Sequence, residues 1–249
     1  MYAGKVPAKV AKYYGMISNI DDNFGRLLAK LEEWDIDRKT IVIFMTDNGG
    51  TAGVEIYNAG MKGKKGTPYQ GGTRVPAFWR WPGVFNAGVD VNQLTAHIDI
   101  FPTLAELAGT KLSKEVRKQV EGRSLVPLLK NKNDKWADRI LFTHVGRWEK
   151  GEASKSKYSL CSVRNTRYEL VNATRGSENW ELFDLQKDFG EKNNVINDHP
   201  DVAGKLKKAL DKWWNETQPY LVNEDVIGPK ENPFKELYRQ QIGGILPKP

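Results

Sequence analysis

The sequence lacks the residues that would indicate a disulfide-bonded or membrane-spanning protein. Its 249 residues contain one cysteine, Cys161, so no disulfide can form within the chain. The longest apolar run, residues 41–45, is far shorter than the ~20 residues that cross a bilayer. Residues 1–10 contain two lysines and no apolar segment of the secretory-signal type. We therefore predict no membrane span and no signal peptide in this chain.

Nucleic-acid motifs are also missing, although the chain is basic. It has no Cys/His spacing typical of a zinc finger and no aromatic RNA-binding run. Its 38 Lys and Arg outnumber 31 Asp and Glu, which gives a net charge of +7 and a pI of about 9.3. Such a balance favours an acidic partner. Because most lysines are scattered, a solvated basic surface explains much of this charge, and we expect no nucleic-acid partner.

The first half of the chain has the pattern of an α/β protein. Residues 10–33 place apolar side chains at steps of three and four, as in an amphipathic helix. Residues 40–46 are β-branched and apolar, which predicts a strand buried on both faces in a parallel sheet. Residues 51–74 read as one long loop and residues 75–81 as a second strand.

The next predictions are a short third strand at residues 94–98 and a helix around residues 102–108. Asp99 stands where the N-cap of that helix would lie, and Gly109 is a suitable stop. Residues 111–138 read as a polar connector.

The second half changes to short strand candidates followed by one helix, at residues 200–214. The strand candidates, whose spacing suits a small antiparallel sheet, are residues 140–144, 158–164, 168–172 and 181–184. We predict three parts: residues 1–137 within an α/β catalytic domain, residues 138–217 as a small α+β subdomain, and residues 218–249 as an irregular tail.

Asp47 and Asn48 directly follow the first predicted strand. Ligands of open α/β sheets bind beyond the carboxyl ends of strands. A carboxylate and an amide oxygen suit Ca²⁺ or Mg²⁺ better than a thiophilic metal. Asp-Asn-Gly is also ordinary turn chemistry, so this pair alone does not decide between a metal site and a turn.

The loop that follows carries three lysines and two glycines within residues 62–67. Glycines let backbone N–H groups approach an anion, and lysine supplies a point charge. The alternative is a solvated basic loop. Gly71 and Gly72, followed by a strand, indicate that the loop is tethered at both ends.

Six segments occur in an order that resembles the back half of an arylsulfatase-type sulfatase, of the alkaline-phosphatase-like superfamily. They are Asp-Asn-Gly-Gly at 47–50, Lys-Gly-Thr-Pro-Tyr-Gln-Gly-Gly-Thr-Arg-Val-Pro at 65–76, Trp-Pro-Gly at 81–83, Ala-His-Ile-Asp-Ile-Phe-Pro-Thr at 96–103, Glu-Gly-Arg-Ser-Leu at 121–125, and Glu-Leu-Phe-Asp-Leu at 181–185 with Asp188 and 191–193 after it. Each segment is loose by itself, but their order from residue 47 to residue 193 is specific.

The resemblance implies a sulfuric ester hydrolase that acts on a sulfated small molecule or polysaccharide. It implies that Asp47 and Asn48 are metal ligands and that Lys65 contacts the sulfate. The implied cofactors are a divalent cation, most often Ca²⁺ with Mg²⁺ as the alternative, and a formylglycine nucleophile. The family also suggests a periplasmic or secreted location.

The nucleophile and the front pair of metal-binding aspartates are expected outside this chain. The family's nucleophile lies in a Cys-x-Pro-x-Arg run, whereas Cys161 is followed by Ser-Val-Arg. We predict that Cys161 is a buried structural thiol. Asp21 and Asp22 lie mid-helix and are predicted to be a helix face. The chain is thus expected to be the C-terminal half of the enzyme.

Other polar residues carry weaker expectations. Gln70 stands where the family usually has Glu, which would leave a plain hydrogen bond to Arg74 in place of an ion pair. His97 is expected to make a structural hydrogen bond. His144, with Arg147 near it, is a candidate for substrate contact. His199 is expected at the surface, at the start of the last helix.

Two other functions fit parts of the pattern. A phosphatase or phosphonate hydrolase of the same superfamily would share the fold, but such relatives often place His beside the strand-end Asp, where this chain has Asn48. A non-catalytic module could bind acidic polymers through the basic loop. The sequence leaves substrate and oligomeric state open.

Overall fold

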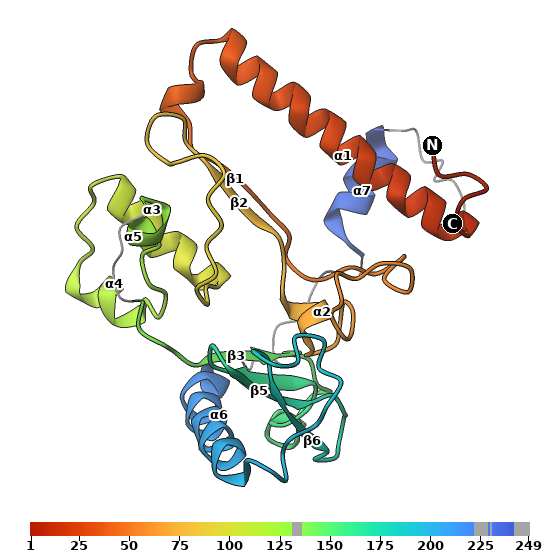
Figure 1. Ribbon diagram of the computed structural model, residues 1–249, viewed down its shortest axis with the longest axis vertical. Helices are drawn as coiled ribbons and strands as arrows, with labels where there is room; N and C mark the ends of the chain where they lie inside the picture. The colour runs from red at the N-terminus through yellow and green to blue at the C-terminus, as the bar shows by residue number, and fades with distance from the viewer. Residues whose placement is uncertain (131–135, 222–228, 230, 242–249) are drawn as a thin grey trace.

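A computed structural model describes residues 1–130, 136–221, 229 and 231–241 (Figure 1). The helices are α1 (Ala8–Glu33), α2 (Gln70–Thr73), α3 (Ile100–Leu107), α4 (Lys114–Gln119), α5 (Val126–Leu129), α6 (Pro200–Leu221) and α7 (Pro233–Gln241). The strands are β1 (Val42–Met45), β2 (Ala77–Arg80), β3 (Leu141–His144), β4 (Cys161–Arg164), β5 (Tyr168–Asn172) and β6 (Trp180–Asp184). None of the helices within these ranges is both long and apolar enough to cross a membrane.

Helix α1 confirms the amphipathic pattern but buries little of its apolar face. Phe24 packs on Phe44 of β1, with ring centroids 5.2 Å apart. Ile17, Ile20 and Leu27 remain between 47% and 52% exposed. Asp21 and Asp22 lie on the exposed face, as predicted. The helix therefore presents an apolar surface that this chain leaves uncovered.

Strands β1 and β2 form a two-stranded antiparallel sheet, with Val42 opposite Arg80 and Met45 opposite Ala77. The prediction of parallel strands is wrong for this pair. The loop after β1 returns the chain at the same end of the strand, so β2 must run back along it. The strands are also not buried on both faces, because every β1 residue is only half-buried and Phe78 of β2 is 65% exposed.

The predicted strand at residues 94–98 is absent from the described chain, where a 3₁₀ turn spans His97–Asp99. Asp99 makes no side-chain cap for α3. Its carboxylate instead pairs with Arg139 and is fully buried. A nearby buried guanidinium is a stronger partner for a carboxylate than the exposed end of a helix, so local cap propensity is overridden.

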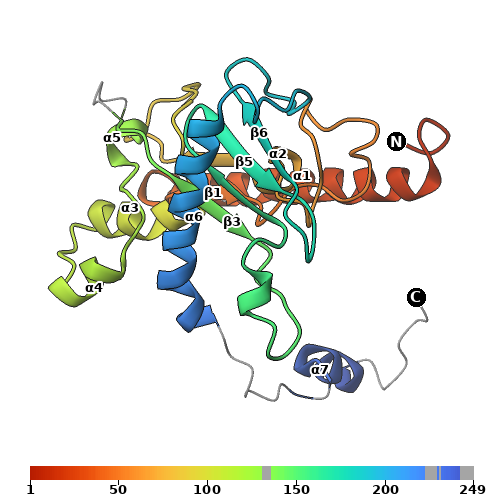
Figure 2. The same ribbon diagram turned by 90° about the horizontal axis from the view of Figure 1, so that it is seen from below.

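The second half folds as predicted into an antiparallel sheet in the order β3-β4-β5-β6. Figures 1 and 2 show α6 lying along one face of this sheet. The core between them consists of Cys161, Val163, Leu170, Leu182, Ala203, Leu206 and Leu210. Cys161 is fully buried, which confirms its structural role.

Helical structure extends further than the sequence pattern indicated. Helix α6 continues through Leu221 rather than ending near Trp214, and α7 lies within the tail that was expected to be irregular. Part of that tail and residues 131–135 of the connector lie outside the described residues. The rest of the connector contains the short helices α4 and α5.

The other face of the small sheet packs against the loop that follows β1. Val171, Phe183 and Leu185 form a second buried cluster, and Tyr69 packs on it. The ring centroids of Tyr69 and Phe183 are 6.2 Å apart. Helix α2 thus lies between the β1–β2 pair and the small sheet (Figure 1). This contact fixes the loop that carries the candidate site.

Candidate active site

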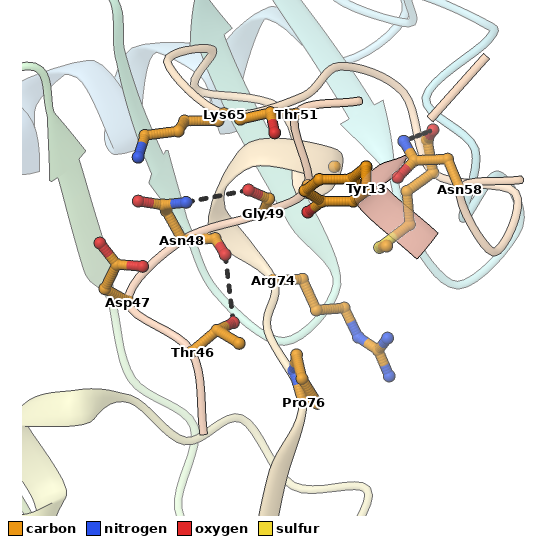
Figure 3. A pocket seen from close by; sticks show the side chains of 13 residues that line it. Tyr13, Thr46, Asp47, Asn48, Gly49, Thr51, Asn58, Lys65, Arg74 and Pro76 are labelled. Atoms are coloured by element: carbon orange, nitrogen blue, oxygen red, sulfur yellow. Dashed lines mark hydrogen bonds between the residues drawn. The ribbon is translucent and has the colours of Figure 1, made fainter. Parts of the chain in front are cut away.

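A pocket of about 370 Å³ lies beyond the end of β1 (Figure 3). Its lining residues come from α1, from the turn after β1, from the lysine-containing loop, and from α2 and the segment after it. They are Tyr13, Thr46, Asp47, Asn48, Gly49, Gly50, Thr51, Asn58, Met61, Lys65, Gly71, Arg74 and Pro76. The three residues predicted as metal and sulfate ligands therefore line one pocket.

The turn at 46–49 orients the two candidate metal ligands. The Thr46 hydroxyl donates to the carbonyl of Asn48 at 3.1 Å. The side-chain nitrogen of Asn48 donates to the carbonyl of Gly49 at 2.9 Å. The amide oxygen of Asn48 therefore points away from its own backbone, and Asp47 is exposed beside it. The turn and the ligand interpretations of Asp-Asn-Gly are thus compatible.

Glycines allow α2 to approach this turn closely. The N–H of Gly49 donates to the carbonyl of Gly72 at 3.0 Å, and the N–H of Lys65 donates to the carbonyl of Gly50 at 2.9 Å. A Cβ on Gly49 would lie 1.8 Å from the carbonyl oxygen of Gly71. Only glycine at position 49 permits this contact. The loop is tethered at both ends, as predicted.

In Figure 3 the carboxylate of Asp47, the amide of Asn48 and the ammonium of Lys65 lie on the same side of the turn. Two hard oxygen donors beside one cation form a surface to which an oxyanion and a divalent ion could bind together. Arg74 extends away from this group. Its guanidinium lies 5.4 Å from the ring of Phe189.

The three lysines of the basic loop do not act as one cluster. Lys62 turns to the small sheet, where its ammonium lies 3.3 Å from the carboxylate of Glu181 and 4.0 Å from the ring centre of Tyr69. The Tyr69 hydroxyl donates to the same carboxylate. Burial and the negative charge of Glu181 raise the pKa of Tyr69, so its hydroxyl keeps its proton. Lys62 is therefore structural, and Lys65 is the lysine that lines the pocket.

Gln70 does not make the expected side-chain hydrogen bond to Arg74. Its amide nitrogen donates to the carbonyl of Phe189 at 2.7 Å, and its backbone N–H donates to Glu191 at 2.9 Å. The side chain is buried against the loop after β6. The sequence pattern missed these partners because they are more than 100 positions away along the chain.

None of the three histidines is among the residues that line this pocket. His97 contacts the carbonyl of Thr46 at 2.9 Å, and this structural hydrogen bond braces the start of the turn. His144 accepts from the N–H of Gly146 at Nδ1 and donates to the carbonyl of Ser156 at Nε2, both at 2.9 Å. Burial lowers the pKa of His144, and the positive charge of Arg175 lowers it further.

The remaining predicted positions are peripheral to the pocket. Arg147 is exposed and, like His144, is not among the lining residues. His199 lies at the start of α6, half-buried, with its ring 5.4 Å from Tyr168.

Two lining residues had no signal in the sequence. Tyr13 comes from α1, where its periodicity indicated only a helix face. Asn58 donates to the carbonyls of Met61 and Gly63 at 2.8 and 2.9 Å and so shapes the loop before Lys65. An isolated Asn in a loop of this composition cannot be distinguished from ordinary turn chemistry by sequence alone.

The donor set fits part of a hard-cation site. Ca²⁺ takes 6–8 oxygen ligands, and Asp47 and Asn48 supply two side-chain oxygens of the right kind. Across the part of the chain that the structure describes, no group of three or more His, Cys, Asp or Glu could hold a metal. Further ligands are needed to complete such a site.

Two models of known protein families match this chain, and their matched regions overlap. Residues 64–216 match the family model of the C-terminal region of N-sulphoglucosamine sulphohydrolase, and residues 2–110 match the sulfatase family model. The chain belongs to the sulfatase family. The predicted resemblance and the α/β class are confirmed.

Alignments with curated sulfatases cover most of this sulfatase chain. It is 32% identical over 219 residues to a sulfatase of Formosa agariphila, which covers 82% of this chain and 39% of the relative. It is 26% identical over 215 residues to an N-acetylglucosamine-6-O-sulfatase of Bacteroides thetaiotaomicron, which covers 86% of this chain and 36% of the relative. The chain thus spans well under half the length of these relatives.

Solved structures show the same fold. Ps i-CgsB in complex with k-i-k-neocarrahexaose matches with a TM-score of 0.72 and 23% identity, covering 98% of this chain and 50% of that one. A phosphonate monoester hydrolase of Agrobacterium radiobacter matches with a TM-score of 0.61 and 27% identity, covering 83% of this chain and 41% of that one.

Proposed function

We propose that this chain is the C-terminal portion of a sulfuric ester hydrolase acting on a sulfated carbohydrate or aryl sulfate. The observation that carries the proposal is the convergence of Asp47, Asn48 and Lys65 on one side of one pocket in a sulfatase-family chain. The N-acetylglucosamine-6-O-sulfatase relative supports a carbohydrate substrate.

Each of the three residues has a distinct role in the proposal. Asp47 and Asn48 would supply two oxygen ligands to a divalent cation, which we propose is Ca²⁺, with Mg²⁺ as the alternative, because both donors are hard oxygens. The cation would neutralise charge on the sulfate oxygens. Lys65 would donate to the sulfate or to the leaving oxygen, where one preorganised donor is worth roughly 3–4 kcal/mol.

The other wall of the site is proposed to lie in the part of the enzyme that this chain does not span. That part would hold the formylglycine nucleophile and the remaining metal ligands. The incomplete donor set and the exposed position of Asp47 support this arrangement. A periplasmic or secreted location is proposed from the family alone, and fractionation of the native cells would test it.

The decisive experiment is an assay of the full-length gene product, including whatever residues precede Met1. We expect hydrolysis of 4-nitrophenyl sulfate or glucosamine 6-sulfate that is lost in EDTA. Lys65→Met should lower kcat/KM by about 10²–10³-fold, whereas Lys64→Met, at an exposed neighbouring lysine, should change it less than about twofold. Equal loss in both variants would refute a specific role for Lys65.

Two results would favour the competing functions. Faster hydrolysis of a phosphonate monoester than of any sulfate ester would assign the chain to that chemistry, which one structural neighbour carries out by name. Binding of sulfated polysaccharide by the full-length product without turnover, unchanged in Asp47→Asn, would favour a binding module. The DNA upstream of Met1 gives a further test. An in-frame Cys-x-Pro-x-Arg run there would support a truncated sulfatase over a non-catalytic binding module.

Arg147 and His144 are the proposed contacts for the sugar or aryl group, with Arg147 the stronger candidate. Both ring nitrogens of His144 are already hydrogen-bonded, whereas Arg147 is exposed. Arg147→Ala should raise KM for a carbohydrate sulfate and leave kcat for 4-nitrophenyl sulfate unchanged. Unchanged KM values for both substrates would remove Arg147 from the substrate site.

A further inference from the structure

Two fully buried glutamates lie where the small sheet meets α2, since Glu169 is opposite Phe183 of β6 and Glu191 hydrogen-bonds to Gln70 of α2. Glu169 on β5 and Glu191 in the loop after β6 are both 0% exposed. Both oxygens of Glu169 and the Oε1 atom of Glu191 have no hydrogen-bond partner among the described residues. Burial of an unpaired carboxylate is costly, so groups in this position either bind a counter-charge or take up a proton.

The backbone holds Glu191 in place at a conformational cost. Its φ angle is 53°, in the left-handed region that a side chain such as glutamate rarely adopts. The carboxylate of Asp188 accepts the N–H groups of Lys192 and Asn193, both at 2.7 Å, and closes the loop around it. A strained residue persists only where its surroundings over-determine it, which marks Glu191 as a fixed contact.

That contact reaches the candidate active site through α2. Oε2 of Glu191 accepts the N–H of Gln70, the first residue of α2, at 2.9 Å. Two residues later, the carbonyl of Gly72 accepts the N–H of Gly49 in the turn that carries Asp47 and Asn48. One hydrogen bond therefore joins Glu191 to α2, and a second joins α2 to the turn.

Few positive charges face the pair. The guanidinium of Arg164 lies 3.8 Å from Glu169, too far for a hydrogen bond. The positive charge of Lys62 acts on Glu191, but its effect is weakened because Lys62 is paired with Glu181. Burial, and next the negative charge of Glu169, raise the pKa of Glu191 to about 8, against the opposing effects of the hydrogen bond from the Gln70 N–H and of the positive charges of Lys62 and Arg164. Burial also raises the pKa of Glu169, against the opposing positive charge of Arg164.

We propose that Glu169 and Glu191 form a carboxyl pair that holds a proton at neutral pH and thereby fixes α2, and with it the Asp47–Asn48 turn, against the small sheet. Glu191 is a positioning residue in this arrangement. Loss of the proton would leave two negative charges in a buried space, only partly offset by Arg164 and Lys62, and their repulsion would open the contact between α2 and the sheet. This coupling is independent of the proposed sulfatase reaction.

The direction of the pH effect follows from the raised pKa of Glu191. When the contact is closed the pair holds its proton up to about pH 8, and when it is open Glu191 titrates near its ordinary value of 4.5. The stabilisation is therefore fully present below pH 4.5 and is lost as pH rises through about 8. Between these values, the opening constant of α2 should rise about tenfold per pH unit.

Hydrogen exchange of the Gln70 amide, corrected for its intrinsic rate, measures the opening constant of α2 directly. In the unmodified chain we expect the opening constant to rise about tenfold per pH unit between about pH 5.5 and 7.5, and to level off above the pKa of Glu191. Glu191→Gln, which mimics the protonated form, should abolish the dependence, and Glu169→Gln should weaken it. Asp198→Asn, at an exposed carboxylate in the same loop of the chain, should retain the full slope.

Three results would overturn the proposal, and none of them requires a variant that folds. One is a ¹³C carboxyl titration of Glu191 in the unmodified chain with a midpoint near 4.5 instead of about 8. Another is faster exchange of the Gln70 amide at about pH 6 when EDTA is added, because that would show that a cation, and not a proton, neutralises the pair. A pH-independent opening constant in the unmodified chain would equally exclude it.

Discussion

The guanidinium of Arg139 donates two hydrogen bonds to the carboxylate of Asp99, at 2.7 and 2.5 Å, in a fully buried ion pair. The same carboxylate accepts the N–H of Ala96 at 2.7 Å and the N–H of Arg123 at 2.8 Å. One buried anion thus ties together the turn before α3, the segment before α5 and the strand region that begins the small sheet. His97, which braces the Asp47 turn, belongs to the first of these.

Arg139→Met should destabilise the chain by about 3–5 kcal/mol, because it leaves the charge of Asp99 buried with only backbone donors. Urea unfolding followed by tryptophan fluorescence measures the change. The control is Lys30→Met, which removes an exposed helical pair with Glu33 and should cost less than about 1 kcal/mol. Similar losses in the two variants would mean that the buried pair contributes no more than a surface pair.

Gly49→Ala should destabilise the chain by about 3 kcal/mol or more, because the new methyl group would overlap the carbonyl of Gly71. The candidate site should be lost with it, so any Ca²⁺ binding measured by calorimetry should disappear. Gly25→Ala tests the same substitution in α1, where nothing lies within 4 Å of the added carbon. It should stabilise the chain by roughly 0.5–1 kcal/mol through helix propensity. Gly49→Ala with wild-type stability would contradict the close approach of α2.

Cys161 should be unreactive in the folded chain. Burial, with a smaller effect of Glu178, raises the pKa of its thiol to about 12, so almost no thiolate exists at neutral pH. Labelling with a chromogenic disulfide at about pH 8 should be at least about a hundredfold slower than in guanidinium chloride. The matched control is Ser154→Cys in a Cys161→Ser background, which places a thiol at an exposed position. Rapid labelling of native Cys161 would contradict its burial.

The apolar face of α1 should be a surface that the rest of the sulfatase domain covers. Ile20 and Leu27 are 52% and 48% exposed, whereas Leu31 on the same helix is 8% exposed. In this chain, the double variant Ile20→Lys, Leu27→Lys should lower self-association and dye binding without changing the unfolding midpoint. Leu31→Lys should lower that midpoint.

Stability measurements on the full-length gene product test whether the apolar face of α1 is covered. In that product the same double variant should lower the free energy of unfolding, because both introduced lysines would be buried. An unchanged stability of the full-length product would mean that this face stays open to solvent.

The sequence by itself determined the elements that depend on neighbouring residues. The three- and four-residue apolar period of α1 and the alternating strands of the small sheet needed no distant partner to be recognised. The order of six short segments from residue 47 to residue 193 indicated the family, and that resemblance pointed to Asp47, Asn48 and Lys65 as the candidate site. The burial of Cys161 followed from its place in an apolar strand.

Only the tertiary structure decided properties that depend on residues far apart in the chain. The antiparallel direction of β1 and β2, the pairing of Asp99 with Arg139 instead of a helix end, and the contact of Gln70 with Glu191 all join distant segments. A local pattern records whether a side chain is apolar or polar, but the partner of a buried polar group is set by how the chain folds back on itself. For that reason the Glu169–Glu191 pair, invisible in the sequence, became apparent only once β5, the loop after β6 and α2 were brought together.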